Sequence, residues 1–272
     1  MVKTQIMAMR LEIYQPHAHY RVPFTYQRRH TYPIPPYSTV KGFLCNILGV
    51  KGYTYGENPE ENSYFQKIKD LKISISGRFK AKTTEMNWLR NLAKSQHEGH
   101  FGGIENRKIY GIAEHIGGQS PVTIDILDEV EITIYLYHDD STFLKYLEKN
   151  LWNPSQRLYP LYLGRAEDWV VIRSVQNTEL HIEKKDANFS SFFWIPQKPW
   201  LPQDILFDFS KIEGLFYRIP TFWSLQNGRR EFQYQLVKLN DGSIQGCWYW
   251  FDDSYGKRGM PVFLCQLRGE EK

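Results

Sequence analysis

The sequence predicts an α+β fold of the ferredoxin-like, or RRM-like, type, in which a split β-α-β arrangement forms one sheet. Alternation of apolar and polar residues indicates strands, and apolar residues at helical spacing indicate two helices between them. In chain order the elements are strand, helix, strand, long insertion, strand, helix and strand. The strands are predicted over 5–14, 69–83, 128–137 and about 169–175, and the helices over 38–49 and 141–151.

The segment after the first strand is rich in proline between residues 16 and 36. Because proline has no N–H group and a fixed φ, it excludes a regular helix or a central strand, and we predict an extended loop lying on the surface. Ser38 is the predicted N-cap of the short helix that follows, which places Val40 and Leu44 on one face. Gly49 is expected to end this helix.

Residues 84–122 form a long, glycine-rich insertion between two predicted strands. Loops of this length are uncommon inside a compact domain and are often functional. After the next strand, Ser141 is the predicted N-cap of the second helix. The run Leu163–Gly164–Arg165 then predicts a turn whose glycine lets the backbone approach a phosphate, although an ordinary turn explains the pattern equally well.

The change in composition near residue 183 predicts two regions. Residues 1–183 are the ferredoxin-like part with its insertion at about 84–122, and residues 184–272 are a β-rich region of short strands, aromatics and prolines. The aromatic run Trp248–Phe251 fits an interface with a partner or a hydrophobic core equally well.

Composition restricts the function classes. Hydrophobic residues make up 42% and charged residues 24% of the 272 residues, which is typical of a folded globular protein. There is no apolar run of about 20 residues and no signal-peptide pattern, so we expect a cytoplasmic protein without a membrane partner. Three widely spaced cysteines indicate neither disulfides nor a zinc site. Nucleotide-hydrolysis and serine-esterase motifs are missing.

Positive charge is concentrated in two stretches of the first 110 residues. Between Ile13 and Gly56 there are five Lys and Arg residues and no acid, and between Arg78 and Tyr110 there are seven bases and three acids. The net charge of the whole chain is only +4, so the rest of the chain is acidic. Clustered Lys and Arg attract phosphates, which favours a nucleic-acid partner over two solvated faces that happen to be basic.

The first candidate site is the segment Tyr20–Lys41, where basic and aromatic residues alternate. Arginine contacts phosphates and aromatic rings stack on bases, which is a common way to hold single-stranded RNA. The alternative is that the tyrosines only pack the loop against the protein. The predicted RNA-binding residues of this segment are Arg21, Tyr26, Arg28, Arg29, His30, Tyr32, Ser38 and Lys41.

The second candidate is the insertion, which contains both basic residues and histidines. Its His97–Glu98–Gly99–His100 fragment matches no zinc signature, because the two histidines are not four residues apart as on a metalloprotease helix. We therefore predict no metal and no cofactor, and interpret the insertion as a basic protrusion over RNA. The predicted RNA-binding residues here are Arg90, Lys94, Arg107 and Lys108, with Gly164 and Arg165 of the turn as a third candidate.

Three motifs carry a resemblance to a known family. They are Thr31–Tyr32–Pro33–Ile34–Pro35–Pro36–Tyr37–Ser38, then Gly42–Phe43–Leu44, and finally Leu161–Tyr162–Leu163–Gly164–Arg165. In this order they resemble the Cas-five family of CRISPR-associated proteins, which belong to the RAMP superfamily and are subunits of type I Cascade complexes. The resemblance covers most of residues 1–175 and is closest to type I-B members.

The resemblance implies an RNA-binding role in antiviral defence. It implies a ferredoxin-like domain with a protruding thumb, formed by the insertion, that caps the 5′ handle of the crRNA. The implied partners are the crRNA, the Cascade backbone subunit, the large subunit and, through the assembled complex, target DNA. By position, Arg28, Arg29, Tyr32, Ser38 and Lys41 line the handle, and Gly164 and Arg165 form a turn against it.

The sequence leaves open whether the chain is an enzyme. In type I-C systems the homologous subunit is a metal-independent endoribonuclease that uses Tyr, Lys and His. This chain has such residues at Tyr26, Lys94, His97 and Lys108, but they do not align with that set. We therefore predict no catalytic residues. The other two hypotheses are a repeat-processing endoribonuclease and a purely structural assembly protein with an incidental basic loop.

Overall fold

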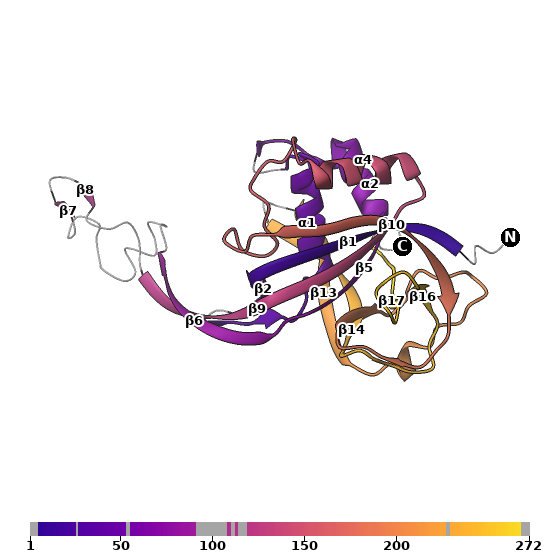
Figure 1. Ribbon diagram of the computed structural model, residues 1–272. Coiled ribbons are helices and arrows are strands. Elements are labelled where there is room, and N and C mark those ends of the chain that lie inside the picture. The colour runs from indigo at the N-terminus through magenta and orange to yellow at the C-terminus, as the bar shows by residue number, and fades with distance from the viewer. Residues whose placement is uncertain are drawn as a thin grey trace.

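The computed structural model describes residues 5–25, 27–52, 55–90, 108–109, 112–113, 119–226 and 229–267. It is a mixed α/β structure dominated by one large sheet of mainly antiparallel strands, with helices α1, α2 and α4 on one face (Figure 1). The helices are α1 (Tyr37–Ile47), α2 (Ser63–Asp70) and α4 (Ser141–Trp152), with short 3-10 turns at Pro59–Glu61 and Phe209–Lys211. No helix among the described residues is both long and apolar enough to cross a membrane.

Four long strands form the centre of the sheet in the order β5-β9-β1-β10, and each neighbouring pair is antiparallel. The predicted strands are therefore present, but their ends differ. The first strand continues to Ala18, and the third begins nine residues earlier than predicted, at Gln119. The bounds are β1 (Gln5–Ala18), β5 (Lys72–Arg78), β9 (Gln119–Tyr137) and β10 (Val171–Glu183).

Strands from the C-terminal region extend this sheet at both edges. β12 pairs with β5 on one side, and β16 pairs with β10 on the other. Residues on both sides of position 183 thus share one sheet. The strands are β11 (Ala187–Asn188), β12 (Phe192–Pro196), β13 (Leu215–Gln226), β14 (Arg229–Asn240), β15 (Ser243–Ile244), β16 (Tyr249–Asp252), β17 (Met260–Val262) and β18 (Cys265–Gln266).

The remaining strands belong to the two candidate segments. β6 pairs antiparallel with the first half of β9, and together they form a ribbon that projects from the body in Figure 1. Residues 84–90 and 119–122 of the predicted loop are thus paired strands, and most of the insertion between them lies outside the described residues. The bounds are β2 (Tyr20–Arg21), β3 (Arg28–Arg29), β4 (Thr31–Tyr32), β6 (Ala81–Arg90), β7 (Lys108–Ile109) and β8 (Ile112–Ala113).

Both predicted helix caps are displaced. α1 begins after Pro36, which has extended backbone angles and no side-chain cap, so Ser38 lies inside the first turn. α4 is capped by Asp140, whose carboxylate accepts hydrogen bonds from the N–H groups of Thr142 and Phe143. Asp and Ser cap equally well, and the sequence alone does not choose between neighbours. Gly49 has φ +66° and ends α1 as predicted.

Alternate residues of the central strands enter two hydrophobic cores. Ile132 and Ile134 of β9 pack toward the helices, whereas Tyr135 and Tyr137 pack toward the C-terminal region. This is the period of two expected of a sheet covered on both faces. The tail aromatics complete the second core, because Trp250 is only 1% exposed, so the aromatic run is mainly core.

A buried carboxylate joins the C-terminal region to the central strands. Asp252 of β16 accepts hydrogen bonds from Arg10 Nη1 (2.7 Å), Tyr135 Oη (2.9 Å), Thr178 Oγ1 (2.8 Å) and Ser254 Oγ (2.6 Å). Desolvation acts to raise the pKa of Asp252, but the hydrogen bonds, those from Ser254 and Arg10 first, outweigh it and hold the pKa below its ordinary value. Asp252 is therefore ionised and paired within the core.

Replacing this carboxylate should weaken the fold in a pH-dependent way. Asp252→Asn removes the buried carboxylate that pairs with Arg10 and leaves it only the part-exposed Glu12, and we expect a loss of about 3 kcal/mol in the free energy of unfolding, measured by urea denaturation at pH 7. Because the folded pKa lies below the unfolded value of about 3.9, wild type should lose this contribution as pH falls from above 3.9 to the folded pKa.

The matched control is Asp253→Asn, because the Asp253 side chain is 74% exposed. This variant should stay within about 0.5 kcal/mol of wild type. Equal stabilities of the two variants would show that the buried network does not hold the C-terminal region in place.

Candidate nucleic-acid interface

The segment between β1 and α1 is folded against the protein instead of lying extended on its surface. β2 pairs with β4, and β3 pairs in parallel with β9. Tyr32 is 3% exposed, and its ring packs edge-on against Trp194 at 5.7 Å and Tyr217 at 5.6 Å between ring centroids. The indole N–H of Trp194 donates to the carbonyl of Pro35. The prediction of a surface-lying loop is therefore wrong for its second half.

Three basic side chains meet at one buried carboxylate: Arg28 and His30 belong to the predicted RNA-binding set, whereas Lys82 was not among its residues. Asp125 of β9, with a side chain 1% exposed, accepts hydrogen bonds from Arg28 (Nε and Nη2, both 3.1 Å) and Lys82 (3.3 Å), and pairs with His30 Nδ1 at 3.1 Å. Desolvation acts to raise the pKa of Asp125, but hydrogen bonds from His30, Arg28 and Lys82 outweigh it and lower the pKa. We call Arg28, His30, Lys82 and Asp125 the Asp125 cluster.

Asp125 thus compensates part of the positive charge of the β1–α1 segment. The sequence of that segment alone does not show this compensation. Asp125 lies 97 residues away from Arg28 in the chain. The outer parts of the cations still face solvent, because the side chains of Arg28 and Lys82 are 53% and 47% exposed. Two permanent cations against one carboxylate leave net positive charge, and exposed Arg21 adds to it.

A second buried carboxylate holds the predicted glycine turn. The Asp168 side chain is fully buried and accepts hydrogen bonds from the backbone N–H groups of His19 (2.9 Å) and Arg165 (2.8 Å) and from Arg165 Nη2 (2.7 Å). Gln15 Nε2 donates to the carbonyl groups of Leu163 and Asp168, each at 2.9 Å. The end of β1 and the turn therefore form one rigid unit.

Gly164 is required at this turn for two reasons. Its φ is +115°, a region that other residues rarely adopt, and a Cβ atom there would lie 2.8 Å from the carbonyl oxygen of His19. The turn places the backbone of Gly164 at the protein surface. The Arg165 side chain, in contrast, is only 18% exposed. Arg165 also lies 3.7 Å from Glu85 of β6, which links the turn to the ribbon.

Two of the predicted motifs meet across a surface cavity of about 230 Å³. Ser38 and Gly42 of α1 form one wall, and Tyr162 and Gly164 of the turn form the other. A second cavity of about 330 Å³ adjoins the other side of α1 and is lined by Lys41, Phe65 and Trp223 among others. We call the first of these the α1–turn cavity.

The other predicted site residues have different fates. Lys41 is 7% exposed, and its Nζ lies 4.7 Å from the Phe222 ring centroid, so it is mainly part of the packing. Burial and, second, nearby Arg21 lower the pKa of Arg29. Arg90 lies in β6 opposite Gln119, and Lys108 lies in β7 opposite Ala113. Tyr26, Lys94, His97 and Arg107 lie outside the described residues.

The ribbon presents two apolar side chains that the sequence predictions did not select as site residues. Met86 and Trp88 alternate with polar residues on β6 and are 69% and 62% exposed. Lys82 lies four residues before Met86 on the same strand, and Trp88 lies two after it, so all three project to the same face. In the sequence, these apolar residues stand among polar residues of a predicted strand. That pattern indicates a binding surface only when the strand is known to project into solvent.

No group of three or more His, Cys, Asp or Glu side chains within the described ranges is placed to hold a metal ion. The candidate interface provides guanidinium and ammonium groups, a hydroxyl-lined cavity and exposed apolar side chains.

Residues 8–100 match the family described as CRISPR-associated protein (Cas_Cas5), and these residues include the Thr31–Ser38 and Gly42–Leu44 motifs. Over this part of the chain, about a third of its length, the sequence is similar to that family. Among proteins with curated descriptions, none matches this sequence.

One solved structure shares the fold of this chain, and two others are reported with lower similarity. A chain in a structure titled "CRISPR RNA-guided surveillance complex" has a TM-score of 0.52 at 12% identity, over 87% of this chain and 90% of that chain. A structure titled "Crystal structure of Cas protein" has a TM-score of 0.43 at 12% identity, over 88% and 98%. A CRISPR protein from Archaeoglobus fulgidus has a TM-score of 0.38 at 11% identity, over 94% and 99%.

The two glycines of the α1–turn cavity should respond oppositely to substitution. Gly164→Ala should lower the free energy of unfolding by about 1–3 kcal/mol, because alanine cannot easily adopt its φ. Gly42→Ala should raise it by about 0.5–1 kcal/mol, because Gly42 lies inside α1 and an added Cβ would meet no described atom within 4 Å. Urea denaturation measures both values, and a stable Gly164→Ala protein would contradict the turn geometry.

Proposed function

We propose that this protein is a Cas5-type, non-catalytic subunit of a type I Cascade complex, in which it binds crRNA and caps its 5′ handle. The observation that carries the proposal is that the α1–turn cavity and the Asp125 cluster lie beside the same turn. Arg165 contacts both Asp168 and Glu85, so the turn and the base of the ribbon are adjacent. An RNA end in the cavity would have its phosphates near exposed cations.

The site residues have distinct roles in this proposal. Arg21, Arg28 and Lys82 would attract phosphates, and Ser38 with the backbone at Gly164 would approach the RNA closely. Met86 and Trp88 would contact bases, since stacking on an exposed aromatic ring contributes about 1–3 kcal/mol per base. Tyr32 and Lys41 would act indirectly, by fixing the backbone that leads into α1.

The strand order β10-β1-β9-β5, with α1 and α4 on one face, supports a ferredoxin-like unit of the RAMP type. In this interpretation the β6–β9 ribbon is the base of the thumb. The proposed partners are crRNA, the backbone and large subunits and, within the assembled complex, target DNA. The proposed place of action is the cytoplasm, in antiviral defence. We keep type I-B as the closest subtype.

RNA binding should depend on the exposed cations and on salt. The informative variant is Arg21→Ala/Arg28→Ala, because Lys82 and His30 still pair with Asp125 and preserve the local fold. We expect binding of handle RNA to weaken about tenfold, and the slope of log K against log salt to become less negative by about 1.4. Fluorescence anisotropy across a salt series measures both quantities.

The matched control is Lys145→Ala/Lys149→Ala, which removes the same charge from exposed positions of α4. It should bind as wild type does at moderate salt. If the two double variants bind equally well, the assignment of the interface to this segment is wrong.

One observation favours the endoribonuclease alternative. His30 pairs with Asp125 through Nδ1, and its side chain is 51% exposed, so Nε2 is available to a substrate hydroxyl. A histidine oriented by a carboxylate is a common general base, and adjacent Arg28 and Lys82 could stabilise developing charge. The α1–turn cavity and the lack of an aligned Tyr, Lys and His set favour binding without cleavage.

Incubation of the protein with CRISPR repeat RNA in EDTA distinguishes the two functions. We expect intact RNA after hours at 37 °C, analysed on a denaturing gel. A discrete product that disappears with His30→Ala would replace the non-catalytic proposal by metal-independent cleavage.

A further inference from the structure

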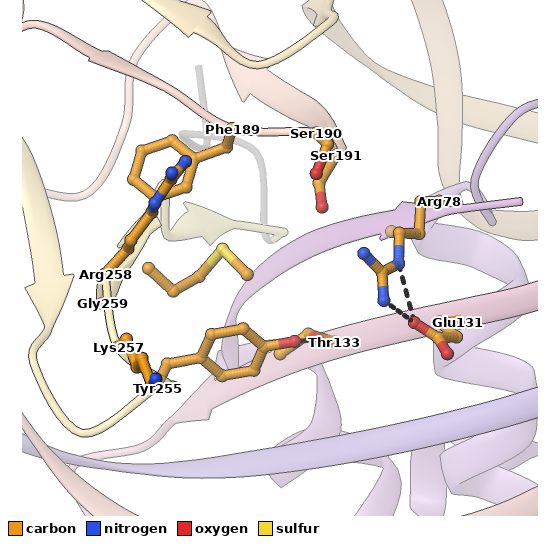
Figure 2. A pocket seen from close by; sticks show the side chains of 13 residues that line it. Arg78, Glu131, Thr133, Phe189, Ser190, Ser191, Tyr255, Lys257, Arg258 and Gly259 are labelled. Atoms are coloured by element: carbon orange, nitrogen blue, oxygen red, sulfur yellow. Dashed lines mark hydrogen bonds and ion pairs between the residues drawn. The ribbon is translucent and has the colours of Figure 1, made fainter.

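A cavity of about 350 Å³ lies on the face of the sheet opposite the helices, where C-terminal loops cross β5 and β9 (Figure 2). Its floor includes Arg78, Glu131 and Thr133 of the central strands. Its walls are the Phe189–Ser191 segment and the turn from Tyr255 to Met260. The volume is within the usual range for small-ligand sites. None of the residues proposed above for handle binding lines this cavity.

The charge of the cavity is net positive. Arg78 pairs with Glu131, with Nε and Nη2 at 2.7 and 2.6 Å from the same carboxylate oxygen. Glu131 also contacts Arg173 at 3.3 Å. Lys257 and Arg258 are exposed on the opposite wall and have no ion-pair partner in the described part of the chain. Three bases and one acid therefore face the cavity, which suits an anion.

The wall that presents Lys257 and Arg258 is held in place by the buried Asp252 network. Asp252 accepts a hydrogen bond from the backbone N–H of Ser254 at 2.9 Å, where the turn begins. The next residue, Tyr255, lies under the guanidinium of Arg10, and its hydroxyl is 3.3 Å from Thr133 Oγ1. At the other end, Gly259 has φ +68° and closes against the Phe251 ring. Both ends of the turn are thus fixed before any ligand arrives.

The cavity also offers groups that a simple anion does not need. Ser190 and Ser191 provide hydroxyl groups and Phe189 provides an aromatic ring to the lining of this cavity (Figure 2). Phe189 has intermediate exposure, and its ring packs edge-on against Phe193 at 6.2 Å between ring centroids. A phosphate would use the cations and hydroxyls, and a base would use the aromatic ring. An acidic protein side chain would use only the cations.

We propose that this cavity is a second nucleic-acid site, which binds the sugar-phosphate backbone of a single strand with one base against Phe189. It goes beyond handle capping and does not depend on it. Glu131 lies six residues from Asp125 along β9, which is about 20 Å at the rise of a strand. The two sites are therefore separate binding positions. RNA and DNA share the phosphate chemistry, and the experiment distinguishes them.

The test uses full-length Lys257→Ala/Arg258→Ala and fluorescently labelled single-stranded 20-mers of RNA and of DNA with one sequence. Loss of two phosphate contacts should weaken binding about tenfold and make the salt slope less negative by about 1.4. A loss confined to one of the two oligonucleotides identifies the strand. Both residues are exposed, so the melting temperature should remain that of wild type.

The Lys145→Ala/Lys149→Ala protein is again the charge-matched control and should bind like wild type. Ultraviolet cross-linking of bromouridine-labelled RNA or bromodeoxyuridine-labelled DNA, mapped by mass spectrometry, should label the peptide that contains Phe189. Equal binding by the two double variants, or a cross-link map without this peptide, would overturn the second site. Because Arg21→Ala/Arg28→Ala probes the first interface alone, failure of either proposal is visible separately.

Discussion

The buried ion pair between Arg10 and Asp252 is the interaction on which the arrangement of the chain depends. Arg10 lies in a central strand and Asp252 lies near the C-terminus, 242 residues away. Asp252 has its hydrogen bonds filled by side chains of β9, β10 and the following turn. Because a buried charge is costly without its partners, the pair fixes where the C-terminal region can dock on the sheet.

The same principle operates at the candidate interface. Asp125 and Asp168 are buried carboxylates that draw basic side chains and backbone N–H groups toward them from the β1–α1 segment. At Asp125 the basic side chains are thereby oriented and only partly compensated, because two permanent cations face one carboxylate. The side chains that attract phosphate are already held in a defined geometry. Binding therefore does not require a large entropy cost for ordering them.

The sheet separates two tasks between its faces. The helix side contributes α1, whose N-terminal half borders the α1–turn cavity, and the other side is covered by the C-terminal aromatic core. The apolar tail therefore stabilises the fold and also builds the wall of a basic cavity. One chain thus presents two surfaces on which basic side chains gather.

The sequence by itself determined the order of strands and helices, because alternation and helical spacing are local properties. It also located the glycine turn and the end of α1, where backbone angles demand glycine. Short α2 was missed, since eight residues give little periodicity, and β9 was predicted too short, although Val122, Ile124 and Ile126 alternate with polar residues in its N-terminal half and are buried. Only the tertiary structure decided that Tyr32 and Lys41 are buried, that Trp250 belongs to a core, and that Asp125 compensates Arg28. Each of those facts depends on contacts between residues far apart in the chain, which local pattern cannot encode.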